Sequence, residues 1–284
     1  MFVIAGVLIV IISVVSGYLA SHGEMLALWQ PFEVLIICGA ALGAFLIANP
    51  ANLQKKTFKL LPQVLLGSRH GSAFYEQLLT CVYSLFQRSR QEGFLSIEQD
   101  VESPFDSELF LRFPDVVRDH ELVQFFTDNY RVFTITGLPS HELEAMMDAE
   151  LELISEELVA PGHAVNRVAE ALPGFGIVAA VLGIVITMGS IGGPMDEIGA
   201  HVAAALVGTF LGVFFAYGFV GPFSAHLERL GEQELQAYLC VKACLTAMAS
   251  GHPPTISVEA GRKMLPPHLR PSFVELSELV KQFR

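Results

Sequence analysis

The basic residues of this chain fall into two blocks, and the rest of the chain contains no lysine or arginine. Residues 55–167 hold ten of the seventeen basic residues, and residues 229–284 hold the other seven. The two stretches without basic residues, 1–54 and 168–228, are also the apolar ones. Cytoplasmic segments beside a bilayer are enriched in Lys and Arg. The partition therefore predicts that both basic blocks are cytoplasmic and that each apolar stretch leaves the cytoplasm and returns to it.

Four runs inside the apolar stretches contain no charged residue and are long enough to cross a hydrocarbon core, which needs about 20 residues. They are Phe2–Ala20, Val34–Leu53, Ala171–Ile191 and His201–Phe223. The composition agrees, because 16% of the residues are charged and the mean hydropathy is +0.50, whereas a soluble domain has roughly 25% charged residues. We predict an all-α integral membrane protein with four transmembrane helices in two hairpins.

The segments that close the two hairpins, Ser21–Glu33 and Gly192–Ala200, also lack Lys and Arg. Both are therefore expected outside the cytoplasm, which places both termini in the cytoplasm. The first run has no basic segment before it and a second run follows at once. We therefore interpret it as a membrane span and not as a cleaved signal peptide.

The sequence divides into four predicted parts. They are the first hairpin (residues 1–53), a helical cytoplasmic domain (54–167), the second hairpin (168–224) and a cytoplasmic C-terminal region (225–284). Apolar residues at helical spacing predict helices over residues 72–90, Asp119–Thr136 and Ser140–Leu158. Residues Gly251–Pro271 are rich in proline and glycine, so we expect them to be irregular, before a short terminal helix.

The sequence offers no pattern for catalysis, for a metal ion or for nucleic acid. Residues 55–167 contain 18 acidic and ten basic residues, a balance that disfavours nucleic acid. His141–Glu144 resembles half of a metal motif without its second histidine, so a solvated helix face is the better interpretation. Cys240 and Cys244 lack further ligands nearby in sequence, and we interpret them as packing thiols. We predict no enzymatic activity, no cofactor and no metal site.

Small residues recur at four-residue spacing in the predicted spans, as Gly39 with Gly43, Ala179 with Gly183, and Gly208 with Gly212. Such pairs let two helices approach closely in lipid. They serve either ordinary packing within one subunit or close packing against a partner chain, and the sequence leaves both interpretations open.

The middle of each predicted span contains no Asp, Glu, Lys or Arg. Transporters and proton pumps keep an ionisable group there, at a cost of roughly 2.5–3.5 kcal/mol on insertion scales. Glu33, Glu170 and Glu228 lie near span ends, where we expect water to solvate them, and the polar groups at depth include Thr209 and Tyr217. This chain alone is a poor proton relay, so another chain must supply the carboxylate if ions are conducted.

Two prolines lie at corresponding places in the second hairpin, Pro173 near the start of the third span and Pro222 near the end of the fourth. The two spans run in opposite directions, so both prolines are expected in the cytoplasmic leaflet. Proline frees a backbone carbonyl and bends helices. The pair either couples the membrane helices to the cytoplasmic domain or is simply tolerated at helix ends, and both interpretations stay open.

Several segments together carry a family pattern, although each is weak alone. They are Leu172–Ala180, Val207–Gly212, Ala216–Phe219 with Pro222, Ser89–Gln91 with Gly93 and Glu98, Val258–Glu259 with Gly261–Lys263, and Arg270–Phe273. In these segments the chain resembles the MotA family, the larger stator subunits of the bacterial flagellar motor, over essentially all 284 residues. The resemblance implies a multi-pass protein of the bacterial inner membrane that converts proton flow into torque.

The resemblance also implies partners and residue roles. MotA-like chains form a ring of five around a dimer of MotB, a single-span protein anchored to peptidoglycan whose aspartate binds the ion. Their cytoplasmic charges engage the rotor protein FliG. By position, the implied rotor contacts are Arg90, Glu98 and Glu150, the coupling prolines are Pro173 and Pro222, and the ion-path residues are Ala180, Thr209 and Tyr217. Sodium-type relatives have threonine where this chain has Ala180, and a methyl group offers no oxygen to sodium, so protons are the predicted ion.

Two other classes of membrane protein share some of these features. The related ExbB and TolQ energisers have one span before the cytoplasmic domain, whereas this sequence predicts two there, which favours the motor. A stand-alone channel or transporter would need an ionisable group within the spans, and the sequence has none in the middle of any of them.

Overall fold

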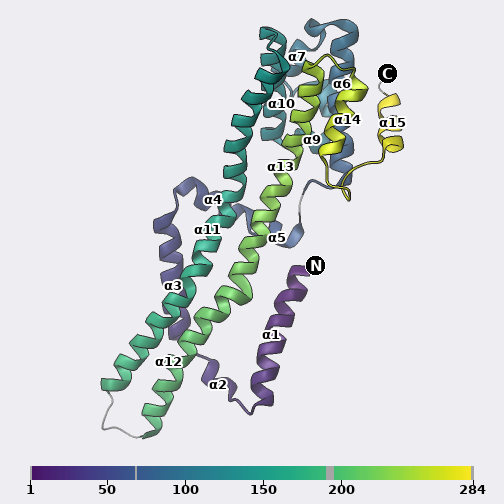
Figure 1. The fold of residues 1–284 in the computed structure, drawn as a ribbon. Helices are drawn as coiled ribbons and strands as arrows, with labels where there is room; N and C mark the ends of the chain where they lie inside the picture. The colour runs from purple at the N-terminus through teal and green to yellow at the C-terminus, as the bar shows by residue number, and fades with distance from the viewer. Residues whose placement is uncertain (1, 68, 190–194, 283–284) are drawn as a thin grey trace. The chain divides into compact units, whose positions relative to one another are not determined.

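The structure is a computed structural model that describes residues 2–67, 69–189 and 195–282, and every regular element in these ranges is helical. Figure 1 traces the chain from α1 to α15. The elements are α1 (Phe2–Ala20), α2 (Met25–Leu28), α3 (Pro31–Ala48), α4 (Ala51–Leu60), α5 (Gln63–Leu66), α6 (Ser72–Glu92), the 3-10 helix η1 (Phe94–Ile97), α7 (Glu98–Glu102), α8 (Glu108–Leu111), α9 (Pro114–Val117), α10 (His120–Thr136), α11 (Ser140–Gly189), α12 (Met195–Phe215), the π-helix η2 (Ala216–Val220), α13 (Gly221–Ala249), α14 (Pro254–Met264) and α15 (Phe273–Lys281).

The chain forms two compact units. The first comprises residues 1–67 and 159–230, and the second comprises residues 68–158 and 231–284. Residues 231–284 belong to the same unit as α6–α10. The chain also passes from one unit to the other inside α11 and inside α13, not in loops.

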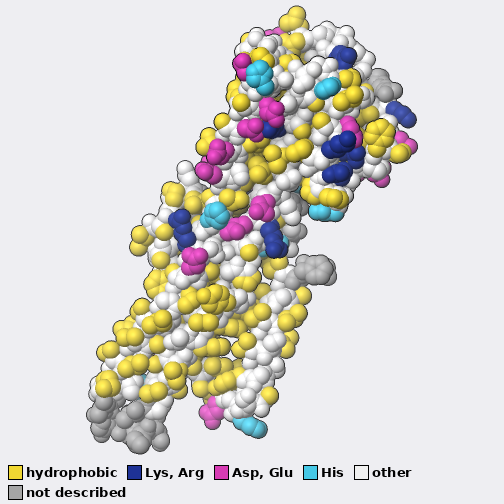
Figure 2. Space-filling model, in the orientation of Figure 1, with side chains coloured by type: hydrophobic (Ala, Val, Ile, Leu, Met, Phe, Trp, Pro, Cys, Tyr) yellow, Lys and Arg dark blue, Asp and Glu magenta, His cyan; other side chains and the backbone are white. Residues whose placement is uncertain are grey.

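Four helical stretches among the described residues are long and apolar enough to cross a membrane, as predicted. They are Val3–Ala20, Met25–Ala48, Ser140–Gly189 and His201–Ala249. Hydrophobic side chains cover the part of this surface formed by α12 and the end of α11 in the view of Figure 2. The second span ends at Ala48 and not at Leu53. Asn49 is extended, because the ring of Pro50 disfavours helical geometry in the residue before it.

The described part of the predicted loop Gly192–Ala200 is helical. Residues 190–194 lie outside the described residues, and α12 already begins at Met195. The helix predicted over Ser140–Leu158 and the third span, predicted over Ala171–Ile191, are both helical as far as Gly189. They are not separate, since α11 is one helix of 50 residues that contains Pro161 and Pro173. Within membrane bundles, neighbouring helices let a helix continue past a proline.

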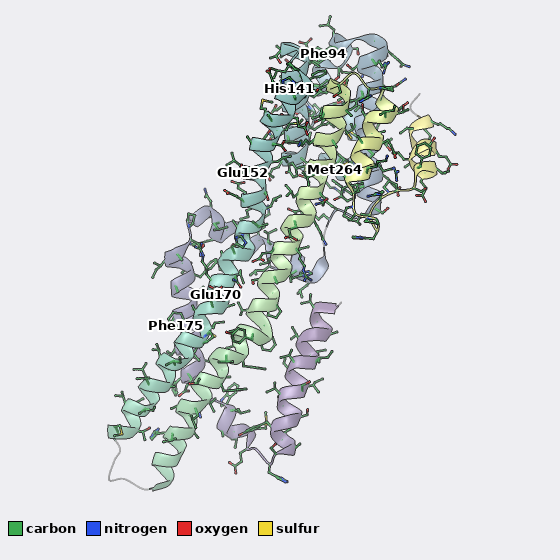
Figure 3. All side chains as sticks on the ribbon, in the orientation of Figure 1. Phe94, His141, Glu152, Glu170, Phe175 and Met264 are labelled. Carbon is green, nitrogen blue, oxygen red and sulfur yellow. The ribbon has the colours of Figure 1, made fainter. Side chains whose placement is uncertain are left out.

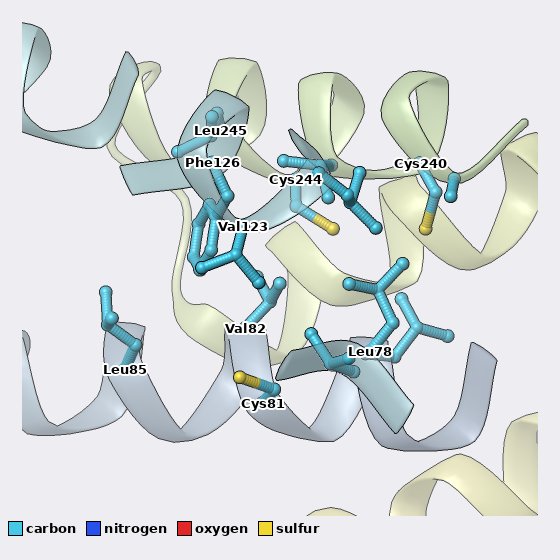
Figure 4. Close-up of a cluster of buried hydrophobic side chains, with 14 of the residues drawn as sticks. Leu78, Cys81, Val82, Leu85, Val123, Phe126, Cys240, Cys244 and Leu245 are labelled. Carbon is cyan, nitrogen blue, oxygen red and sulfur yellow. The ribbon is translucent and has the colours of Figure 1, made fainter. Parts of the chain in front are cut away.

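The core of the second unit is built by α6, α10, the end of α13 and the C-terminal helices. Figure 4 shows part of it, with Cys81 and Leu85 of α6 facing Phe126 of α10 and Cys244 of α13. The helices predicted over residues 72–90 and Asp119–Thr136 are confirmed as α6 and α10. All four cysteines are free, and Cys240 and Cys244 are fully buried, as packing thiols should be. Burial raises the pKa of the Cys81 thiol.

The expectation of an irregular segment over Gly251–Pro271 is wrong, because α14 occupies Pro254–Met264. Pro254 is the first helical residue, where proline is favoured and does not break the helix. Gly261 permits close packing on α13, since a Cβ there would lie 2.8 Å from the carbonyl oxygen of Cys240. The expected terminal helix is α15, which starts with a capping box of Ser272 and Glu275.

Candidate ion path and rotor-contact sites

Glycines allow α11 and α12, the second pair of membrane helices, to pack closely. A Cβ at Gly212 would lie 2.7 Å from the carbonyl oxygen of Leu172 and 2.8 Å from the Cα of Gly176. A Cβ at Gly176 would in turn lie 3.0 Å from the carbonyl oxygen of Gly208. The backbones of α11 and α12 therefore touch along this line, as small residues permit in lipid.

The same contact brings two of the predicted ion-path residues together. A Cβ at Gly208 would lie 3.4 Å from the backbone nitrogen of Ala180, so Ala180 and the neighbouring Thr209 lie at one level of the helix pair. Both side chains are half-buried. Tyr217 lies eight residues further on, about 12 Å along the helix, and its side chain is 73% exposed. Ala180 on α11, Thr209 on α12 and Tyr217 on η2 thus follow one another along the helix pair, and none of the three carries a carboxylate.

The pairs of small residues are used in two different ways. Ala179, Gly183, Gly208 and Gly212 all pack between α11 and α12 of the same chain. The pair of Gly39 and Gly43 does not, since a Cβ at either position would meet nothing within 4 Å. For the second hairpin, the interpretation as packing within one subunit is therefore the one that the structure supports.

Both predicted coupling prolines lie inside helical runs and not at helix ends. Pro173 is in the interior of α11. Pro222 is the second residue of α13, and the π-helix η2 joins α12 to α13 without a break. The backbone N–H of Gly221 donates to the carbonyl oxygen of Ala216, five residues back. π-Helical turns of this kind are common at functional sites.

The two prolines do not lie at the same depth. Ser224 donates from Oγ to Oδ1 of Asn166 at 3.3 Å, which places Ser224 at the level of Asn166. Because the helices are antiparallel, Pro222 lies about two residues deeper than this level and Pro173 about seven residues deeper. The prolines are therefore offset by about 7.5 Å along the axis, or roughly one and a half turns.

Acidic groups near the span ends differ in their access to water. Glu170 is exposed and accepts from Asn166 Nδ2 at 2.9 Å, and Figure 3 labels it on α11 one turn before Phe175. Glu33 lies in the first turn of α3, and its Oε2 atom is buried without a hydrogen-bond partner among the described residues. The expectation that water solvates Glu33 therefore holds for only part of its carboxylate.

The predicted rotor contacts Arg90 and Glu98 lie on either side of one tight corner. Arg90 is in the last turn of α6, Glu98 begins α7, and both side chains are exposed. Gly93 turns the chain between them with φ +85°, a conformation that glycine adopts without strain. Phe94, at this corner, is labelled in Figure 3 at the same end of the second unit as His141.

An ion pair of the buried Asp100 with Arg88, which sequence reasoning missed, supports this corner. Arg88 donates from Nη1 to Oδ2 of Asp100 at 3.0 Å, and Ser107 donates from Oγ to Oδ1 of Asp100 at 2.5 Å. Asp100 is buried, and Ser107 caps α8 by accepting from the backbone of Leu109 and Phe110. The network joins the end of α6 to α7 and α8, so it fixes the positions from which Arg90 and Glu98 project.

Glu150, the third predicted rotor contact, is only partly available. Its Oε2 atom accepts from Nδ2 of the buried Asn129 at 2.9 Å, which links α11 to α10. Two residues before Glu150, Asp148 accepts from Nζ of Lys242 at 2.6 Å, and an oxygen of Glu144 lies 3.3 Å from the same nitrogen. Burial alone would lower the pKa of Lys242, but its hydrogen bonds to these two carboxylates raise it.

Two family models match this chain. The model of the motility protein A N-terminal region matches residues 4–93, and the model of the MotA/TolQ/ExbB proton channel family matches residues 118–239. Together with four helices of membrane-spanning length, these matches define the class of protein: a multi-pass inner-membrane subunit of a proton channel.

Curated relatives narrow this class further. The chain is 40% identical over 281 residues to Motility protein A of Escherichia coli strain K12, a match that covers 99% of this chain and 95% of the relative. It is 39% identical over 273 residues to the chemotaxis protein LafT of Vibrio parahaemolyticus, with 96% of each covered. The chain belongs to the Motility protein A family.

Two solved structures share the fold. One is the structure of C. jejuni MotAB, with a TM-score of 0.72, 18% identity and coverage of 93% of this chain and 95% of that one. The other is the flagellar MotAB stator complex from Bacillus subtilis, with a TM-score of 0.63, 22% identity and the same coverage. The helical unit between the second and third spans is therefore part of a known architecture.

Proposed function

We infer that this chain is a stator subunit of a bacterial flagellar motor, which with a MotB-type partner forms a proton-conducting complex that turns ion flow into torque. The observation that carries this function is the 40% identity to a Motility protein A across 99% of the chain. The energy source is adequate, since each elementary charge crossing 100 mV releases about 2.3 kcal/mol.

The partner supplies the group that this chain lacks. We propose five copies of the chain around two copies of a single-span, peptidoglycan-anchored partner, whose aspartate binds the proton beside Ala180, Thr209 and Tyr217. The exposure of Tyr217 and the absence of Asp, Glu, Lys and Arg from the middle of the predicted spans support this arrangement. Both termini lie in the cytoplasm in this scheme, and the chain itself has no enzymatic activity and no cofactor.

Torque is delivered through the corner that bears Arg90 and Glu98, which we propose contacts the rotor protein FliG. Both residues are exposed, and the bonds of Arg88 and Ser107 to the buried Asp100 keep the corner in one conformation. A contact that transmits force must be rigid, because a mobile loop would move instead of displacing the rotor. Glu150 contributes at most one free carboxylate oxygen, since the other is bonded to Asn129.

Deletion of the gene should leave cells with flagellar filaments that do not rotate, and restoring the gene should restore rotation. The reason is that a stator is needed for torque and not for filament assembly. The measurement is rotation of tethered cells, with electron microscopy to show the filaments. Normal rotation in a host without a second stator gene would contradict the stator function.

Rotation should continue in sodium-free medium, because the methyl group of Ala180 offers no oxygen to a dehydrated sodium ion. Tethered-cell speed is the measurement, with the proton gradient collapsed by an uncoupler as the control that should stop the motor. Arrest in sodium-free medium at an intact proton gradient would refute proton use.

Charge reversal at the rotor corner should reduce torque without affecting assembly. We expect Arg90→Glu and Glu98→Lys each to lower stall torque, because a charge on the rotor then meets a like charge. Arg118→Glu is the matched control, since Arg118 is also an exposed arginine of the second unit, 80% accessible and paired only with its neighbour Asp115. Unchanged torque in both reversals and in the double variant would exclude these two roles.

A further inference from the structure

Positive charge is concentrated just after the second membrane span. Residues 34–75 carry four basic and no acidic side chains, in a chain whose formal net charge is −12. Three of the four, Lys55, Lys56 and Lys59, lie on the ten-residue helix α4. This density of charge is a local feature, since the chain as a whole is acidic.

The corner between α3 and α4 is held by its own hydrogen bonds. Gln54 donates from Nε2 to the carbonyl oxygens of Leu46 at 3.0 Å and Asn49 at 2.8 Å. The ring of Phe58 meets that of Phe45 edge-on, with 5.7 Å between centroids. Since α3 is about 27 Å long, roughly the thickness of a hydrocarbon core, its end marks the membrane surface. The lysines of α4 are therefore fixed at headgroup level.

Helix α4 has two different faces. On one face, Thr57 is buried and Leu60 packs against the apolar cluster that contains Val165 of α11 and Leu227 of α13. On the other face, Lys55 and Lys59 are exposed, and Phe58 between them is 50% exposed. Lysines beside an aromatic ring on one face are typical of helices that lie at a membrane surface.

The two exposed lysines have no counter-charge in the structure. Neither Lys55 nor Lys59 forms an ion pair within the described parts of the chain. They stand at i and i+4 on one helix face, where like charges repel each other. An anion bound between the two ammonium groups would offset this repulsion.

We propose that the α4 corner, defined as Phe45, Lys55, Phe58 and Lys59, binds an anionic phospholipid of the leaflet at which it lies. The headgroup phosphate pairs with the ammonium groups of Lys55 and Lys59, and the first acyl carbons contact the exposed ring of Phe58. The choice of a lipid over a protein partner rests on the position of the face at the end of an apolar span and on its one-signed charge. The lipid fastens this corner of the stator to the membrane surface, and the site does not depend on torque generation.

The test uses the complex with its MotB-type partner in phosphatidylcholine vesicles. These contain equal small amounts of two photo-crosslinking lipids, one with a phosphatidylglycerol and one with a phosphatidylcholine headgroup. Adducts on chymotryptic peptides from residues 51–66 are counted by mass spectrometry. Because each lysine near a surface contributes about fivefold to the attraction of anionic lipid, the phosphatidylglycerol adducts should exceed the others at least about fivefold.

Three variants and one change of condition decide the result. Lys55→Gln/Lys59→Gln should bring the adduct ratio near one, whereas Lys55→Arg/Lys59→Arg should keep it. Lys263→Gln/Lys281→Gln, which removes two exposed lysines of the second unit, should leave it unchanged. Raising the salt should lower the ratio of the unmodified protein, since exposed charges are screened, and this measurement stands even if a variant fails to assemble. A ratio near one in the unmodified protein, or one unaffected by the Gln variant, would overturn the proposal.

Discussion

Replacing Gly212 with valine is expected to abolish filament rotation in cells that depend on this chain. A Cβ at Gly212 would lie 2.7 Å from the carbonyl oxygen of Leu172, a backbone atom that has no rotamer through which to give way. The two helices must then separate, and overpacking of this kind costs about 1–3 kcal/mol. Because Ala180 and Thr209 lie next to this contact, at the level of Gly208, separation of the helices also displaces the predicted ion path. Tethered-cell rotation and purification of the complex measure the two effects.

Gly174→Val is the matched control for this experiment. Gly174 lies on α11, the other helix of this contact, and a Cβ there would meet nothing within 4 Å in the described structure. Gly212→Ala should be intermediate, since it adds the clashing atom but no branches. Full rotation in the valine variant would mean that α11 and α12 do not pack as closely in the assembled motor.

Replacing Pro173 with alanine is the second change with a large expected effect. The complex should assemble normally and yet produce several-fold less torque. Alanine restores the N–H that proline lacks, so α11 gains a hydrogen bond and becomes a more regular helix at this level. If the coupling of the membrane helices to the second unit depends on bending of α11 at Pro173, a conformational change in the membrane helices is then no longer transmitted to the second unit. Stall torque, measured together with the amount of complex in the membrane, separates coupling from assembly.

Pro161→Ala provides the comparison within the same helix. Pro161 is also inside α11, but it is buried and lies next to the contact between Gly162 and Glu228. Its replacement should affect stability and leave the torque of each assembled complex near normal. Equal torque in the Pro161→Ala and Pro173→Ala variants would mean that Pro173 is simply tolerated in the helix and has no role in coupling.

Much of the fold could be predicted from the sequence, because the relevant patterns are local. The buried face of α6 repeats at helical spacing, and the span lengths follow from charge-free runs. The continuity of α11 could not be predicted, since Pro161 and Gly162 indicate a break. Gly162 does not end the helix but permits close packing of α11 against α13, since a Cβ there would lie 2.9 Å from the backbone nitrogen of Glu228. The two residues are 66 positions apart, so the sequence around Gly162 gives no indication of this contact.

The candidate sites were predictable only in part. Arg90 and Glu98 were identified through resemblance to a family, since an exposed charge has no distinguishing pattern of its own. Their support by Asp100 was missed, because Arg88 and Asp100 lie 12 residues apart across a turn. The one available signal was Ser107, whose position before Glu108–Leu111 is that of an N-cap and whose hydroxyl binds Asp100.

The passage of the chain between its two units inside α11 and α13 limits how this protein can be recombined with its relatives. An α-helix turns about 100° per residue, so a junction at Leu158 or Leu230 that gains or loses one residue turns every later side chain onto another face. Chimeras joined there should work only when the residue count of both parents is kept, or changed by about seven. The segment near Gly67, between α5 and α6, carries no such requirement and is the natural place for a reporter insertion.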